Sequence, residues 1–230
     1  MSKIPTFSYF ILPPGLTCAA LQARFTAFAD LVGVDTAFTL TNYAYDHEPT
    51  RLPAVVHDWR TFIAQRFAHL REALAPVLTF AFWLDNDEEL TVNVILNPAE
   101  RYMVLMANHN FFPMHNNVSD FLHLCQVLYD QVHPIYGYGI LETFVQPAIS
   151  SADAQQIDTL YNHNFLGPAL VQAYGRQRLR TINAEAISDL ADGGMLLVME
   201  ANPYQRLTDD ITAYATAIKL LQIPRFVQVG

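Results

Sequence analysis

The chain has 230 residues, 52% of them hydrophobic and 12% aromatic, which excludes a disordered protein and allows one large core. A net charge of −9 argues against nucleic-acid binding, which needs a basic surface, and is compatible with a basic protein partner. No apolar run approaches the ~20 residues of a membrane span, and Met1–Pro5 lacks the features of a secretion signal. We therefore expect a cytoplasmic protein that does not bind a membrane.

The first third of the chain predicts a strand and two helices. The apolar run Ile4–Leu12, ended by Pro13-Pro14-Gly15, is typical of a strand or an edge segment. A helix should begin after the N-cap Thr17 and end at Gly33. Residues 37–45 predict a strand, and a second helix should run to Pro76. The apolar faces of the two helices are Leu21, Phe25, Phe28, Val32 and Val56, Trp59, Ile63, Phe67, Leu70, Leu74.

The middle of the chain gives the clearest strand pattern. Val77–Leu84 is apolar, and Leu90–Leu96 alternates apolar and polar residues as a half-buried strand does. The acidic residues Asp85–Glu89 should form the turn between them. A third strand is expected at Tyr102–Ala107, and the short connections predict an antiparallel meander.

The second half continues with helices and strands. After a loop at 108–117, a helix capped by Ser119 should end at Pro134, and Tyr138–Val145 predicts a strand. A short helix from Ser150 or Ser151 through Leu160 and another from Gly167-Pro168 through Leu179 should follow. Thr208, with Asp209 and Asp210 in the first turn, should begin a last helix along Ile211, Tyr214, Ile218 and Leu221, before a terminal strand at 226–229.

Asp192-Gly193 lies between two apolar runs within Ala186–Met199. This pattern predicts a β-hairpin with a type I′ turn, which needs positive φ at both central residues. The uncharged run Met195–Met199 is typical of a strand covered on both faces. The alternative is a short helix from Asn183 to Ala191 that ends at Gly193.

These elements predict an α+β fold, in which a mainly antiparallel sheet, the meander plus the C-terminal hairpin, packs against amphipathic helices. Residues 1–230 should form a single compact domain, with sub-lobes at 1–117 and 118–230. Leu70, Leu74, Pro76 and Phe80 recur 58 residues later as Leu128, Val132, Pro134 and Tyr138. The recurrence suggests two related helix–proline–strand units, although helices often end before proline by chance.

Candidate reactive groups are scattered. His109 and His115 share a loop, and with His123, His133 or His163 they would bind zinc if they converged with Asp120 or Glu142. No His-Glu-x-x-His, nucleophile elbow or Walker loop supports catalysis, and no cofactor is expected. Cys18 and Cys125 are expected to be buried free thiols, with a disulfide between them as the alternative.

A second group of candidates would line a pocket. It comprises Tyr136, Tyr138, Glu142, Arg176 and Arg178, with Glu142 or Glu200 as a buried acid that meets Arg176 or Arg178. Such an ion pair would equally serve a structural role. Tyr136-Gly137-Tyr138-Gly139 lacks the third glycine of a dinucleotide fingerprint and is interpreted as a flexible lead-in to a strand.

Part of the second half resembles bacterial immunity proteins. The resemblance covers roughly the last hundred residues and rests on glycines, prolines and apolar positions: Pro134–Gly139, Asn164–Pro168, Gly175-Arg176, Arg178-Leu179 and Asp192–Leu197. It is to the α+β immunity families of polymorphic and type VI secretion toxin systems. It implies a non-enzymatic protein that binds and neutralises a cognate toxin, and it supplies no catalytic residues.

Two functions from different classes therefore remain open. The first is an immunity-type binding module whose basic toxin partner contacts Asp85, Asp87, Glu88 and Glu89. The second is a small enzyme or ligand-binding protein with a site near the histidine-rich loop at 109–123. A homodimer is compatible with either function.

Overall fold

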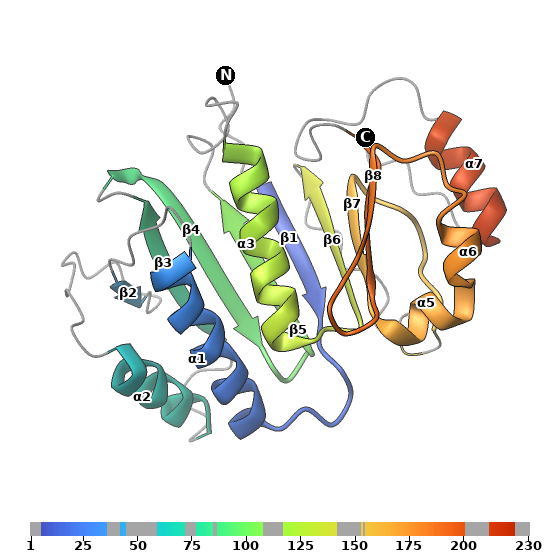
Figure 1. Cartoon of the computed structure of the whole chain (residues 1–230). Helices are drawn as coiled ribbons and strands as arrows, with labels where there is room; N and C mark the ends of the chain where they lie inside the picture. Colours follow the sequence, from blue (N-terminus) through green and yellow to red (C-terminus); the bar gives the residue numbers. More distant parts are fainter. Residues whose placement is uncertain are drawn as a thin grey trace. The chain divides into compact units, whose positions relative to one another are not determined.

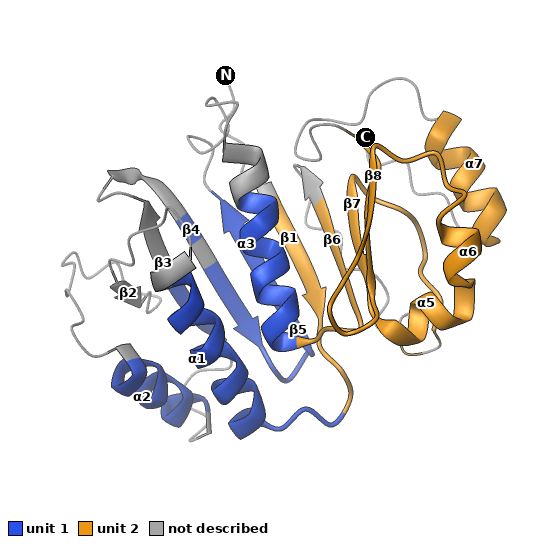
Figure 2. Cartoon of the chain, in the orientation of Figure 1, with its two compact units in different colours: residues 1–5, 15–132 blue, residues 6–14, 133–230 orange. Residues whose placement is uncertain are grey.

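The computed structural model describes residues 6–35, 42–44, 59–71, 77–84, 87–107, 117–141, 153, 155–200 and 212–223. They have the predicted α+β fold (Figure 1). The chain divides into two compact units, Met1–Pro5 with Gly15–Val132 and Thr6–Pro14 with His133–Gly230 (Figure 2). The expectation of one domain with sub-lobes 1–117 and 118–230 stays a prediction. Within the described part of the chain, no helix is both long and apolar enough to cross a bilayer.

The first unit contains the predicted meander. Strands β3 (Leu78–Leu84), β4 (Asp87–Asn97) and β5 (Tyr102–Ala107) pair antiparallel in chain order. The short strand β2 (Asn42–Ala44) pairs with β3, and the rest of the predicted strand at 37–45 lies outside the described residues. Asp87–Glu89 belong to β4, with Asp87 opposite Leu84, so the prediction that they form a turn is wrong. The strand extends back to Asp87 because that residue pairs with Leu84, beyond an irregularity in the register between Trp83 and Leu84.

Helix α1 (Cys18–Asp35) begins where the sequence predicts. The Thr17 hydroxyl oxygen accepts a hydrogen bond from Ala20 N at 3.2 Å, which confirms the N-cap. The helix continues through Gly33, so the predicted end there is wrong. The predicted apolar face is confirmed, because all four of its side chains are buried: Leu21, Phe25, Phe28 and Val32.

Aromatic rings join the elements of this core. The ring centroids of Phe25 and Phe80 lie 4.6 Å apart, and those of Phe25 and Phe67 lie 6.3 Å apart. These contacts pack α1 and α2 (Trp59–Arg71) against β3. Helix α3 (Asn117–Val132) adds buried Phe121, Leu124, Cys125 and Leu128. Arg24 Nη1 donates to Val132 O at 2.6 Å and so satisfies a carbonyl at the end of α3.

The second unit contains an antiparallel sheet in the order β1-β6-β7-β9-β8. Its strands are β1 (Thr6–Ile11), β6 (Tyr136–Leu141), β7 (His163–Leu166), β8 (Ala186–Asp189) and β9 (Met195–Val198). The pairings include Tyr9 with Tyr138, Gly139 with His163 and Ala186 with Val198. All four residues of β7 and all four of β9 are buried, so both strands are covered on both faces. For β9 this confirms the sequence prediction.

The C-terminal hairpin is confirmed, but its predicted turn is wrong. Leu190 N donates to Gly194 O at 3.0 Å, so three residues, Ala191 to Gly193, form the loop. Gly193 has φ +91°, whereas Asp192 is not among the residues with positive φ. The Asp192 carboxylate accepts the Gly194 N–H at 2.8 Å. A type I turn followed by a left-handed glycine therefore replaces the type I′ turn.

Two predicted helices in this unit differ from the structure. The expected start of the first one, at Ser150 or Ser151, lies outside the described residues, and Asp153 is helical. Its expected end, residues 155–160, is irregular, because side chains bind the backbone there: Ile157 N donates to the Tyr174 hydroxyl at 2.8 Å. The helix predicted from Gly167-Pro168 is split into α5 (Pro168–Tyr174) and α6 (Arg176–Leu179). Gly175 separates them with φ +85°, a conformation that an α-helix cannot contain.

Helix α7 (Thr212–Leu221) buries Tyr214, Ile218 and Leu221, as predicted. Its expected start at Thr208 to Asp210 and the strand expected at 226–229 lie outside the described residues. Helix α2 precedes β3 and α3 precedes β6, so both predicted helix-to-strand units exist. Their common origin stays a prediction.

Candidate functional site

The histidines that were predicted to bind zinc do not form a cluster in the described part of the chain. His109 and His115 lie outside it. His123 is exposed on α3, whereas His163 is fully buried in β7. Among the described residues, no group of three or more His, Cys, Asp or Glu side chains is placed to hold a metal ion.

The predicted acidic contact surface is only partly described. Asp85 lies outside the described residues, and Asp87, Glu88 and Glu89 are placed by their backbone at the start of β4. Their role in partner binding stays a prediction. Neither cysteine forms a disulfide; Cys125 is buried and Cys18 is partly exposed.

The predicted pocket residues make separate contacts. Tyr136 and Tyr138 are buried in the core of the second unit, with ring centroids 5.6 Å apart. Burial raises the pKa of both hydroxyls, so both stay protonated. Glu142 lies outside the described residues. Glu200 accepts a hydrogen bond from the Tyr214 hydroxyl at 3.2 Å, so the predicted pairing of Glu200 with Arg176 or Arg178 is wrong.

A buried polar pair lies between β1 and β7, on either side of β6. Ser8 Oγ and His163 Nε2 share a hydrogen bond of 3.1 Å, and both side chains are fully buried. Burial lowers the pKa of His163 to about 3, so the imidazole is neutral at physiological pH. A serine beside a neutral imidazole is the arrangement of an activated nucleophile. Full burial keeps substrate away from this pair, which therefore has a structural role.

The glycines of the Tyr-Gly-Tyr-Gly segment make room for this core. A Cβ on Gly139 would lie 1.7 Å from Cε1 of His163, and a Cβ on Gly137 would lie 2.5 Å from a ring carbon of Phe10. Both glycines lie inside β6 and are paired with β1 and β7. The interpretation of this segment as a flexible lead-in to a strand is therefore wrong.

Asn164 organises the chain around it. Its side chain accepts hydrogen bonds from Tyr161 N at 3.0 Å and the Tyr136 hydroxyl at 2.9 Å, and donates to Tyr161 O at 2.8 Å. Asn164 is fully buried. The Asn164 side chain therefore satisfies the backbone N–H and C=O groups of Tyr161, which a helix or a strand would otherwise satisfy.

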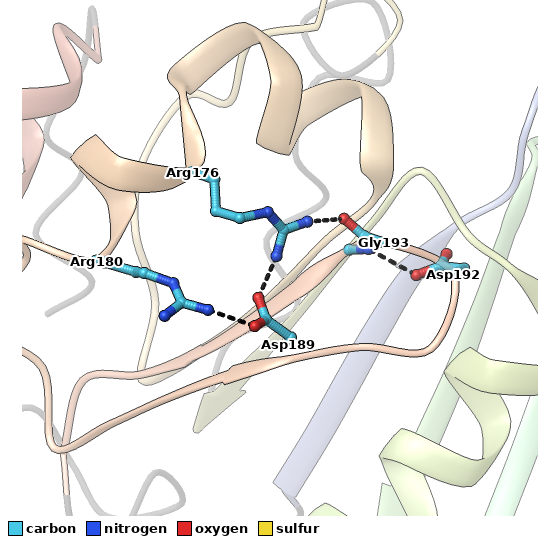
Figure 3. A network of polar contacts seen from close by, with 6 residues as sticks. Arg176, Arg180, Asp189, Asp192 and Gly193 are labelled. Atoms are coloured by element: carbon cyan, nitrogen blue, oxygen red, sulfur yellow. Dashed lines mark hydrogen bonds and ion pairs between the residues drawn. The ribbon is translucent and has the colours of Figure 1, made fainter.

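The exposed polar network of the second unit connects α6 with the β8–β9 hairpin. Figure 3 shows Arg176 and Arg180 directed at the Asp189 carboxylate, and each guanidinium donates to a different carboxylate oxygen. Arg176 also donates to the carbonyl of Gly193 in the hairpin loop. The side chains of Arg176, Asp189 and Arg180 are 37%, 46% and 51% exposed. We call this exposed polar group, made of Arg176, Arg180 and β8, the hairpin surface.

Sequence reasoning missed Asp189 and misassigned Arg178. Arg178 donates to Leu220 O near the end of α7, so it connects two helices. Arg176 and Arg180 lie four residues apart, which places both on one side of a helical turn. Two spacings in the sequence could have indicated the network. One is this pair of arginines, and the other is Ile187 with Asp189, which lie two residues apart and so share one face of a strand.

Comparisons with known proteins support the fold. No family model matches the chain, and no curated protein matches it. Among solved structures, a protein named "Pseudomonas aeruginosa T6SS protein PA0821" aligns with 97% of this chain and 73% of its own chain. The TM-score is 0.52 and the sequence identity is 17%, so the likeness is one of fold.

Proposed function

We propose that this chain is a non-enzymatic protein-binding module that neutralises a cognate bacterial toxin, as immunity proteins of type VI secretion systems do. The observation that carries the proposal is the likeness in fold, over 97% of the chain, to a Pseudomonas aeruginosa protein whose name refers to type VI secretion. That name says nothing of immunity. The step to immunity comes from the sequence resemblance to immunity families.

The glycines on which the resemblance to immunity proteins rests determine the path of the backbone, which supports a scaffold without catalysis. Gly139 accommodates the His163 ring, Gly175 separates α5 from α6, and Gly193 closes the hairpin loop. Positions of this kind specify the scaffold and contribute no reactive side chain, as a non-enzymatic protein requires. The net charge of −9 favours a partner with a basic surface, because complementary charge speeds encounter and excludes wrong partners.

The test is co-expression of this chain with the products of the genes on either side of its own, tested as candidate toxins. We expect one of these products to co-purify with the chain, and the chain to restore growth of cells that express it. A folded chain that neither binds nor protects against either product would contradict the proposal.

A pair of charge reversals tests the acidic contact surface. Glu88→Lys, at the start of β4, should weaken toxin binding by about tenfold or more, because it places like charges at the interface. Glu100→Lys is the matched control, since Glu100 is an exposed acid in the turn after β4. Equal weakening by both variants would indicate a nonspecific charge effect and remove Asp85–Glu89 from the interface.

A further inference from the structure

Strand β8 is the outermost strand of the second unit's sheet. It pairs with β9, and no strand pairs with its other side among the residues that the structure describes. Ala186, Ser188 and Asp189 are exposed and Ile187 is half-buried, whereas every residue of β9 is buried. An open edge of this kind is a template for another strand, and β8 contains neither the proline nor the lysine that commonly protects edges.

The register shows which backbone groups of β8 face outward. Leu190 N donates to Gly194 O, which makes this pair a hydrogen-bonded one. Hydrogen-bonded pairs alternate along an antiparallel ladder, so Ser188 and Ala186 also direct their backbone groups toward β9. The N–H and C=O groups of Ile187 and Asp189 therefore point to the open side.

The charges beside this edge are unequal. Arg176 and Arg180 both donate to the single carboxylate of Asp189, so the group carries a net positive charge. A guanidinium has five N–H donors, and Arg180 uses one of them on Asp189. A second carboxylate next to Asp189 would balance the two arginines. Glu185 is exposed and lies directly before β8, two residues from Ile187. Glu185 of a second copy of the chain would supply such a carboxylate.

We propose that β8 is a dimerisation edge, at which a second copy of this chain adds its own β8 in antiparallel orientation about a two-fold axis. The outward groups of Ile187 set the register, with Ile187 opposite Ile187 of the second copy. This register places Glu185 of each copy opposite Asp189 of the other, where Arg176 and Arg180 lie between the two carboxylates. The contact is self-complementary, as a two-fold interface requires, and it is independent of toxin binding.

The first experiment is sedimentation equilibrium of the full chain over a wide range of concentration. We expect a concentration-dependent monomer–dimer equilibrium. Ile187→Pro should weaken the dimer by about tenfold or more, because proline removes the outward N–H but no bond to β9. Ile187→Val is the matched control; it keeps the N–H and should still dimerise. A wild-type chain that stays monomeric, or an Ile187→Pro dimer of unchanged affinity, would overturn the proposal.

A charge exchange tests the register and does not depend on proline. Glu185→Arg and Arg180→Glu should each weaken the homodimer, because each leaves like charges around Asp189. An equimolar mixture of the two variants should regain the wild-type affinity, since each interface then holds two positive and two negative groups. Variants that dimerise alone, or a mixture that stays monomeric, would contradict the pairing. Toxin protection by the monomeric variants is measured separately, so the failure of one proposal is distinguishable from the failure of the other.

Discussion

His163 Nε2 lies 3.1 Å from Ser8 Oγ, although 155 residues separate them in the chain. The pair joins a strand near the start of the chain to one in its second half, and both side chains are fully buried. A buried hydrogen bond of this kind stabilises one arrangement of strands, because any slip would leave both groups unsatisfied. Because the His163 imidazole can bind a proton, the pH dependence of stability tests the contribution of this pair.

We expect His163 to make the stability of the protein fall on acidification. The unfolded chain binds a proton at this imidazole below pH about 6.5, whereas burial lowers the pKa in the folded chain to about 3. Stability is therefore lost as pH falls from 6.5 toward 3, by up to about 1.4 kcal/mol per pH unit. His163→Gln, which cannot titrate, should show a shallower loss in denaturant unfolding measured across this range.

The control for this experiment is His123→Gln, because His123 is exposed on α3. The control should follow the wild-type dependence. Identical slopes for wild type and His163→Gln would show that the buried imidazole does not contribute.

Gly139→Ala should destabilise the protein, although alanine favours a strand more than glycine does. The added Cβ would lie 1.7 Å from the His163 ring, so the ring or the strand must move. Overpacking of this kind typically costs about 1–3 kcal/mol. Thermal unfolding measures the loss.

The double variant Gly139→Ala with His163→Ala identifies the cause. Removing the ring relieves the clash, so the double variant should be more stable than the sum of the single changes predicts. Strict additivity would mean that Gly139 is needed for some reason other than the His163 ring.

Arg176→Ala should loosen the β8–β9 hairpin while changing global stability little. The ion pair of Arg176 with Asp189 is partly exposed, and such pairs contribute about 0–1 kcal/mol. The same side chain also bonds the Gly193 carbonyl, so its loss frees the hairpin loop from α6. Amide hydrogen exchange should therefore accelerate in residues 186–198.

Gln177→Ala is the matched control, since Gln177 is the exposed neighbour of Arg176 on α6. It should leave exchange in the hairpin unchanged. Faster exchange in both variants would assign the effect to α6 itself and not to the arginine.

The elements that follow a simple periodicity were predictable. The buried face of α1, the meander and the buried strand β9 all follow from the spacing of apolar residues. Strand β7 was missed because its first two residues, His163 and Asn164, are polar and yet fully buried. Their burial depends on partners from distant segments, Ser8 and Tyr136, which periodicity does not reveal.

The same limit applies to the hairpin surface. Arg176 was selected as a candidate, but its acid partner was expected at Glu142 or Glu200, whereas Asp189 fills that role. Local spacing predicts which side chains share a face, and only the path of the chain determines which faces meet. Gly175 illustrates the point, because one positive φ turns a predicted single helix into two and directs the arginines toward β8.

The placement of Thr6–Pro14 in the second unit has a consequence for biosynthesis. Strand β1 leaves the ribosome well before its partner β6, which is synthesised about 130 residues later. At roughly 5–20 residues per second, β1 waits many seconds with its apolar side chains uncovered. A nascent chain in this state is a natural substrate for chaperones, and fusions that bury or restrain residues 6–11 should impair maturation of the second unit more than that of the first.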